Sequence, residues 1–123
     1  MILPAAHYGR DGMVAIALVA QAMASGRVDL RALADALPRY RMVKDRTHGT
    51  GEPWERSEAR LRAAFSGYEV NTADGLRFAR EGAWVHVRPS GTEPIVRIIA
   101  ESATDEETRD LVTRARDAIQ SRA

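Results

Sequence analysis

Residues 68–101 read YEVNTADGLRFAREGAWVHVRPSGTEPIVRIIAE, and this stretch decides the fold. Four short segments within it have the side-chain pattern of strands, at residues 68–72, 76–80, 83–88 and 95–101. The first three alternate apolar and polar side chains, and the fourth is rich in β-branched residues. Asp74-Gly75 and Glu81-Gly82 separate the first three segments, and such pairs favour tight hairpin turns. The stretch therefore predicts a series of strands that pair in an antiparallel way.

The sequence on either side of this stretch predicts one more strand and two helices. Residues 39–46 have the pattern of a strand, and a helix is expected from Pro53 to about Ser66. A last helix begins at Thr104, where Thr104 and Glu107 have the spacing of a capping box. The order strand, helix, three strands, strand, helix predicts an α+β fold, a mostly antiparallel sheet of four to five strands with helices packed on one face.

A separate helical segment precedes this predicted domain. Residues 13–24 form a helix that is apolar on nearly all sides, with Asp11 as its N-cap and Ser25-Gly26 as its stop. A second, shorter helix is expected at residues 29–37, with Asp29 as its N-cap. A helix that is apolar all round is normally buried, and one modest core would not cover it. We therefore expect residues 1–28 to be a helical remnant of an adjacent domain, and residues 29–123 to form the main domain.

The composition excludes several classes of function. The 123 residues include 18 basic and 17 acidic side chains, so the formal net charge is +1. A protein that binds nucleic acid or a membrane surface normally has a larger basic excess. The chain has no cysteine, which excludes disulfides, thiolate metal sites and a cysteine nucleophile. The longest apolar run, residues 13–24, is too short to cross a bilayer, so we expect a cytoplasmic protein without nucleic-acid or membrane partners.

The segment that carries chemistry is the loop RPSGTEP at residues 88–94, together with the strand after it. Five residues there are candidates for binding an anion: Arg88, Ser90, Gly91, Thr92 and Arg97. The hydroxyls are short donors, and the glycine allows a positive φ so that backbone N–H groups can approach an anion closely. The two arginines enter from the flanking strands, and their planar guanidinium groups match phosphate oxygens. The pattern predicts a phosphate-binding loop.

Other interpretations of the charged and polar residues stay open. Pro-Ser-Gly is a common turn sequence, so the loop could be a plain hairpin connection, and Glu93 would repel a phosphate unless it points inward. The charges of residues 39–46 suit an edge strand or a nucleic-acid-binding strand. His7 and Arg10 are candidates for lining a substrate cleft. Alternatively, Asp11 caps the helix that follows it and pairs with Arg10.

The two remaining histidines have simpler interpretations. His48 is expected to be solvated in a Gly/Thr-rich turn, and His86 is expected on one face of a strand, two positions before Arg88.

The segment RPSGTEPIVR at residues 88–97, followed by Glu101, closely resembles the C-terminal domain of the α-D-phosphohexomutases. This family includes phosphoglucomutase, phosphomannomutase and phosphoglucosamine mutase. The resemblance covers roughly residues 39–123, and residues 2–12 with the apolar helix after them look like the end of the family's third domain. It implies that the loop at residues 88–97 grips the phosphate of a sugar phosphate. It also implies an intramolecular phosphotransferase that uses a phosphoserine and a bisphosphosugar intermediate to interconvert hexose 1-phosphate and hexose 6-phosphate.

The resemblance further implies that this chain is a fragment of a longer enzyme. The family's catalytic serine motif and Asp-rich magnesium loop do not occur in the sequence, so we expect no catalytic residue, metal site or mutase activity in the chain itself. We expect a sugar phosphate as its ligand, with Mg²⁺ and a hexose 1,6-bisphosphate as cofactors of the full-length enzyme only. The helix at residues 13–24 is expected to support dimer formation or exchange between chains. The alternative is a small α/β nucleic-acid-binding or protein-interaction module.

Overall fold

A computed structural model describes residues 2–49 and 51–121 of the chain. The chain forms two compact units, one ending at Pro38 and the other beginning at Arg39. The predicted boundary between residues 28 and 29 differs from this observed one, because the short helix α2 (Leu30–Asp35) contacts α1 (Gly12–Gly26) within the first unit. The assignment of the first segment to an adjacent domain stays a prediction.

Both helices of the first unit begin at the predicted caps. Asp11 Oδ1 accepts a hydrogen bond from the N–H of Met13 at 2.7 Å, and Asp29 Oδ1 accepts one from the N–H of Ala32 at 2.7 Å. No residue of α1 is buried, and the side chains of Met13 and Ile16 are 75% and 65% exposed. Association of chains through this helix stays a prediction.

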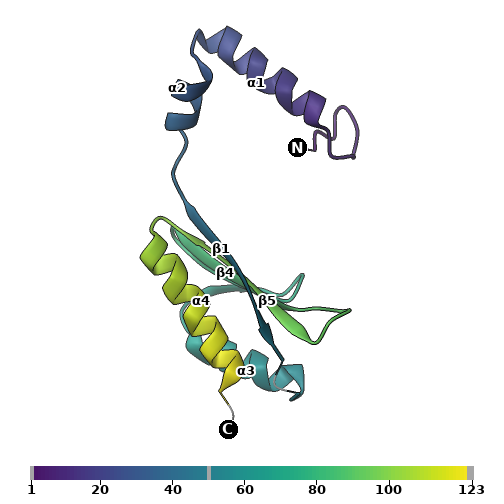
Figure 1. The fold of residues 1–123 in the computed structure, drawn as a ribbon, viewed down its shortest axis with the longest axis vertical. Coiled ribbons are helices and arrows are strands. Elements are labelled where there is room, and N and C mark those ends of the chain that lie inside the picture. The colour runs from purple at the N-terminus through teal and green to yellow at the C-terminus, as the bar shows by residue number, and fades with distance from the viewer. Residues whose placement is uncertain (1, 50, 122–123) are drawn as a thin grey trace. The chain divides into compact units, whose positions relative to one another are not determined.

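The second unit has the predicted α+β fold (Figure 1). Its elements are β1 (Arg41–His48), α3 (Trp54–Ala64), β2 (Glu69–Asn71), β3 (Leu76–Arg80), β4 (Ala83–Pro89), β5 (Ile95–Ser102) and α4 (Asp105–Gln120). The five strands form one sheet in the order β1-β5-β4-β3-β2, and every neighbouring pair is antiparallel. Because β1 lies at an edge of this sheet, the edge-strand interpretation of its charges agrees with the topology.

Alternation along the strands gives the sheet a covered face and an open face. On β4, the buried residues are Ala83, Val85 and Val87, and the partly exposed residues between or after them are Trp84, His86 and Arg88. The helices α3 and α4 pack on the covered face (Figure 1). Phe65, the residue that follows the last turn of α3, stacks on Phe78 of β3 with ring centroids 5.0 Å apart, and both side chains are buried. The open face therefore projects the side chains that the core does not use.

The turn between β2 and β3 packs against the end of β4. Gly75 has a φ of +71°, and a Cβ at this position would lie 2.5 Å from the carbonyl oxygen of Val87. Only a glycine allows the two backbones to approach so closely. The carbonyl oxygen of Asp74 also accepts a hydrogen bond from Nε2 of His86, which lies on the open face as predicted. The turn is thereby held beside Arg88.

The N-terminus of α4 has half of the predicted capping box. Thr104 Oγ1 accepts a hydrogen bond from the N–H of Glu107 at 3.2 Å, but the carboxylate of Glu107 pairs with Arg80 of β3. The buried hydroxyls of Ser102 and Thr108 are 2.7 Å apart and join β5 to this helix. The helix cap is therefore coupled to the sheet by side chains from two strands.

Candidate functional site

The loop that joins β4 to β5 is closed at its base by backbone hydrogen bonds. The N–H of Ser90 donates to the carbonyl oxygen of Ile95 at 2.8 Å, and the N–H of Ile95 donates to that of Glu93 at 2.8 Å. Pro89 and Pro94 fix φ at the two ends. The loop therefore has little conformational freedom left to lose when it binds a ligand.

A hollow of about 320 Å³ opens beside this loop. Its lining consists of the five residues predicted to bind an anion together with one proline: Arg88, Pro89, Ser90, Gly91, Thr92 and Arg97. Arg88 and Arg97 are opposite each other in the register of β4 and β5, so both extend from the same face of the sheet. The structure thus brings all five predicted residues to one concavity.

Several hydrogen-bond donors of the loop have no partner in the described part of the chain. The backbone N–H groups of Gly91, Thr92 and Glu93 make no hydrogen bond with another described residue, and the same is true of the hydroxyls of Ser90 and Thr92. N–H groups and hydroxyls without partners, beside two guanidinium groups, form an arrangement that can bind and orient an anion.

Gly91 does not use the conformational freedom that glycine allows. Its φ is not in the left-handed region, which glycines 51, 67, 75 and 82 occupy. A Cβ at Gly91 would meet no atom within 4 Å. The fold itself therefore does not require glycine here, and the absent side chain leaves space that a ligand can use.

Both arginines of the hollow are held by exposed carboxylates. Arg88 Nη1 donates to Asp74 Oδ2 at 2.8 Å, and Arg97 Nη2 lies 3.7 Å from Glu93 Oε2. The side chains of these pairs are 42% to 63% exposed, and exposed ion pairs contribute only about 0–1 kcal/mol each. Glu93 therefore turns toward Arg97, and an incoming dianion competes with two weakly bound carboxylates.

Asp74 is the residue of this site that sequence reasoning missed. Its turn was predicted from the Asp-Gly pair, but that signal says nothing about which strand the turn approaches. The register of β3 on β4, with Leu76 opposite Val87, places the turn at the end of β4 and so beside Arg88. Only the three-dimensional pairing of the strands reveals this contact.

His7 and Arg10, predicted to line a cleft, lie in the first unit. His7 Nε2 donates to Asp11 Oδ2 at 2.8 Å, so Asp11 pairs with His7 and not with Arg10, contrary to the prediction. The hydrogen bonds from His7 and from the backbone N–H of Val14 lower the pKa of Asp11 below its ordinary value of 3.8. The stability that this cap contributes is therefore fully present above the ordinary pKa of 3.8 and is lost as the pH falls through the lowered pKa.

The other polar residues mark no second reactive centre. His48 ends β1 and does not lie in a turn, and Trp84 Nε1 donates to Glu101 Oε1 at 3.1 Å on the open face. Among residues 2–49 and 51–121, no group of three or more His, Cys, Asp or Glu side chains is placed to hold a metal ion. None of the described helices has both the length and the apolar character that crossing a membrane requires.

Comparison with known proteins identifies relatives of this chain. A protein of Thermococcus kodakarensis described as phosphoglucomutase/phosphomannomutase is 35% identical over 112 residues, which cover 89% of this chain and 24% of that protein. A probable phosphoglucosamine mutase of Methanothermobacter thermautotrophicus is 38% identical over 112 residues, covering 86% and 25%. A solved structure of a phosphoglucomutase/phosphomannomutase family protein from Burkholderia thailandensis is 27% identical, with a TM-score of 0.52 over 72% of this chain and 19% of that one.

The family model that matches describes the same unit that the structure separates. Residues 39–118 match the C-terminal domain of phosphoglucomutase/phosphomannomutase, and Arg39 is also the first residue of the second unit. The chain spans about a quarter of the length of the curated relatives it matches. This chain therefore belongs to the phosphoglucomutase/phosphomannomutase family, and its second unit corresponds to the C-terminal domain of that family.

Proposed function

We propose that this chain supplies the domain that binds the phosphate group of a hexose phosphate in a phosphohexomutase. One observation carries the proposal: the five predicted residues line a single hollow, where three backbone N–H groups and two hydroxyls of the loop have no hydrogen-bond partner among the described residues. The family match supports the reaction class, which is the interconversion of hexose 1-phosphate and hexose 6-phosphate.

The energetics favour a phosphate over the carboxylates that now hold the two arginines. Each exposed ion pair contributes only about 0–1 kcal/mol, so little is lost when one is given up, and a dianion gains by contacting more donors at once than either carboxylate does. A phosphate dianion in the hollow would accept hydrogen bonds from Arg88 and Arg97 at once. It would also accept bonds from the loop N–H groups, which neither Asp74 nor Glu93 contacts. The carboxylates therefore act as exchangeable partners.

A site that recognises only the phosphate suits this reaction. The resemblance implies that a phosphoserine elsewhere in the longer enzyme donates a phosphoryl group, and that the bisphosphosugar then turns over before the second transfer. The loop must accept the phosphate of either orientation of the sugar, and a cradle of N–H, hydroxyl and guanidinium donors does not distinguish the carbon to which the phosphate is attached. Such remote contacts position the reacting end of the substrate.

The chain's own part in this reaction is binding and orientation. The resemblance also implies Mg²⁺, but the described residues contain no cluster of side chains that fits this ion. The chain is therefore expected to show no mutase activity alone, and turnover of glucose 1-phosphate by the isolated chain would contradict the proposal.

Sugar selectivity is not expected from this loop. The relatives are described as acting on different sugars, including a phosphoglucosamine/phosphogalactosamine mutase of Sulfurisphaera tokodaii that is 31% identical over 122 residues. Since the hollow presents phosphate ligands, we expect glucose 6-phosphate, mannose 6-phosphate and glucosamine 6-phosphate to bind with affinities within a few-fold of one another.

Titration of the isotope-labelled chain with glucose 6-phosphate tests the proposal by NMR. The backbone amides of residues 90–92 and the side-chain Nε of Arg88 and Arg97 should shift selectively, because they would contact the phosphate. Glucose without phosphate is the control ligand and should shift none of them. The absence of a selective shift at millimolar glucose 6-phosphate would contradict the proposal.

A further inference from the structure

Three arginines lie in a row across the open face of the sheet. The register places Arg46 of β1 opposite Arg97 of β5, and Arg97 opposite Arg88 of β4. Like charges directly opposite one another on neighbouring strands destabilise a sheet. The row therefore concentrates positive charge, and a bound anion would reduce the repulsion within it.

Two cations of β1 lack a carboxylate partner among the described residues: Arg46, which is in this row, and Lys44, which lies two positions before it on the same face. Arg88 and Arg97 are held by Asp74 and Glu93, but Lys44 and Arg46 form no ion pair with another described residue. Asp45 lies between these two cations in the sequence, but its carboxylate accepts a hydrogen bond from Nε of Arg116 at 3.2 Å on the side of α4.

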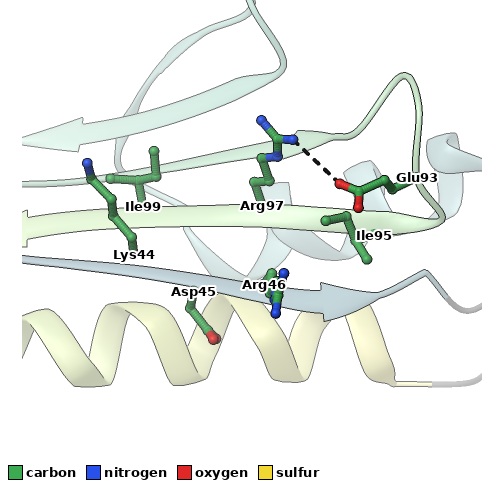
Figure 2. Close-up of a pocket in the computed structure, with 7 residues that line it drawn as sticks. All are labelled: Lys44, Asp45, Arg46, Glu93, Ile95, Arg97 and Ile99. Carbon is green, nitrogen blue, oxygen red and sulfur yellow. Dashed lines mark ion pairs between the residues drawn. The ribbon is translucent and has the colours of Figure 1, made fainter.

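Figure 2 shows this difference in direction. Lys44 and Arg97 extend to one side of the strands, and Asp45 extends to the other, toward α4. The positive charge of β1 on the open face is thus not neutralised by its own neighbour in the sequence.

These cations border a second hollow, of about 560 Å³, beside the first one. Lys44, Arg46 and Arg97 supply its positive charge, and Ile95 and Ile99, on either side of Arg97 along β5, supply an apolar surface (Figure 2). Arg97 lines both hollows, so the two adjoin the same side chain. Glu93 also lines the second hollow, where it is already paired with Arg97.

We propose that Lys44, Arg46 and Arg97 form a second anion-binding subsite next to the phosphate-binding loop. The subsite would take a second phosphate or carboxylate group, carried by the ligand in the loop or by a separate anion. Arg97 would bridge the two groups, because one planar guanidinium has enough donors for two anions. This inference extends the proposed function. Because the subsite is built from residues of β1 and β5, it could bind an anion even if the loop does not.

Protection of an exposed edge explains only part of this pattern. Charged side chains on an edge strand hinder pairing with another chain wherever they point. That role does not require both unpaired cations to face the same side as Arg97, nor to border a hollow with an apolar surface. A ligand site requires both features.

Titration of the full chain with inorganic phosphate, followed by NMR, tests the subsite. We expect two sets of amides to shift, residues 90–92 for the loop and residues 44–46 with 97–99 for the subsite. The double variant Lys44→Gln/Arg46→Gln should weaken binding at the second set by at least about tenfold, since two charge-assisted contacts are lost. Binding at the loop set should change less than about threefold, because the loop donors remain.

A matched double variant controls for the loss of two charges. Arg56→Gln/Arg109→Gln removes two exposed cations of α3 and α4, and it should leave both sets unchanged. The proposed subsite is overturned if only the loop amides shift. It is also overturned if both double variants weaken the binding reported by the second set of amides to the same extent. Shifts at the second set without shifts at the loop would retain the subsite and reject the proposed function.

Pyrophosphate distinguishes the two sources of the second anion. If one ligand occupies both hollows, pyrophosphate should shift both sets with a single dissociation constant and bind at least tenfold more tightly than phosphate. Two dissociation constants would support a separate anion at the subsite. In either case the Lys44→Gln/Arg46→Gln variant should remove the response of the second set, and its persistence would contradict the proposal.

Discussion

The two faces of the sheet are built from alternate residues of the same strands, yet they have opposite characters. On the covered face, Phe78, Val85 and Ile98 have no exposed surface. On the open face, Arg88 and Arg97 are partly exposed and paired only with exposed carboxylates. Residues that specify the fold and residues that are available for binding therefore alternate along the same strands. Each face should therefore respond to substitution in its own way.

The largest effect is expected from a cavity on the covered face. Phe78→Ala removes the ring that stacks on Phe65 and should lower the free energy of unfolding by about 3–5 kcal/mol. Urea denaturation measures this change. Arg77→Gln, at the preceding position on the open face, is the matched control. It should lower the free energy of unfolding by less than about 1 kcal/mol, because the side chain loses only a cation–π contact with Trp84. Equal losses for the two variants would remove the distinction between the faces.

The next effect concerns binding. Arg97→Gln removes a charged donor from the loop site. It should weaken the binding of glucose 6-phosphate by about 1.5–3 kcal/mol, which raises the dissociation constant roughly tenfold to a hundredfold. The same variant should leave the free energy of unfolding within about 0.5 kcal/mol, because the side chain is exposed. Calorimetric titration and urea denaturation of the one variant supply both values. A stability loss that matches the binding loss would show that Arg97 serves the fold.

Substitution of two glycines by alanine should have different effects on stability. Gly75→Ala should destabilise the chain by at least about 1–3 kcal/mol, because φ is positive and the new Cβ would collide with Val87. Gly91→Ala should change stability by less than about 0.5 kcal/mol, because its φ is ordinary and the space is empty.

Binding should respond to Gly91→Ala where stability does not. The added methyl group would displace a phosphate held by the loop, and we expect glucose 6-phosphate binding to weaken by at least about tenfold. Melting curves and titrations of both glycine variants provide the measurements. Unchanged binding in the Gly91→Ala variant would show that this space is not used by the ligand.

The smallest expected effect is a gain in affinity for glucose 6-phosphate. Asp74→Asn keeps a residue that favours the hairpin turn but removes the carboxylate that competes for Arg88. Glucose 6-phosphate should then bind more tightly by about 0.2–1 kcal/mol, a factor of roughly 1.5 to 5. Glu81→Gln removes a carboxylate from the neighbouring turn and should have no effect. Weaker binding in Asp74→Asn would mean that this carboxylate positions Arg88 for the ligand.

Local patterns in the sequence were sufficient for most of the fold and for the core of the site. Alternation predicted β3 and β4, the two glycine-containing pairs predicted their turns, and Asp11, Asp29 and Thr104 cap helices as expected. The candidate loop at residues 88–94 could also be predicted, because its residues are neighbours along the chain and the two strands around it pair as a hairpin. These features depend on contacts between residues that are close in the sequence.

The features that sequence reasoning missed depend on pairing between distant segments. Pairing of β1 with β5 places Arg46 opposite Arg97, although 50 residues separate them in the printed sequence. The contact between Asp74 and Arg88 likewise requires the register of β3 on β4. The division of the chain after Pro38 could not be predicted for a related reason, since α2 has ordinary helix signals and only its contact with α1 assigns it to the first unit.

A crystal structure of the chain with bound glucose 6-phosphate tests the central claim most directly. We predict the phosphate within hydrogen-bond distance of the backbone N–H groups of Gly91 and Thr92 and between the guanidinium groups of Arg88 and Arg97, which would have left Asp74 and Glu93. A phosphate bound elsewhere, with both arginines still paired to these carboxylates and the loop donors facing solvent, would contradict it.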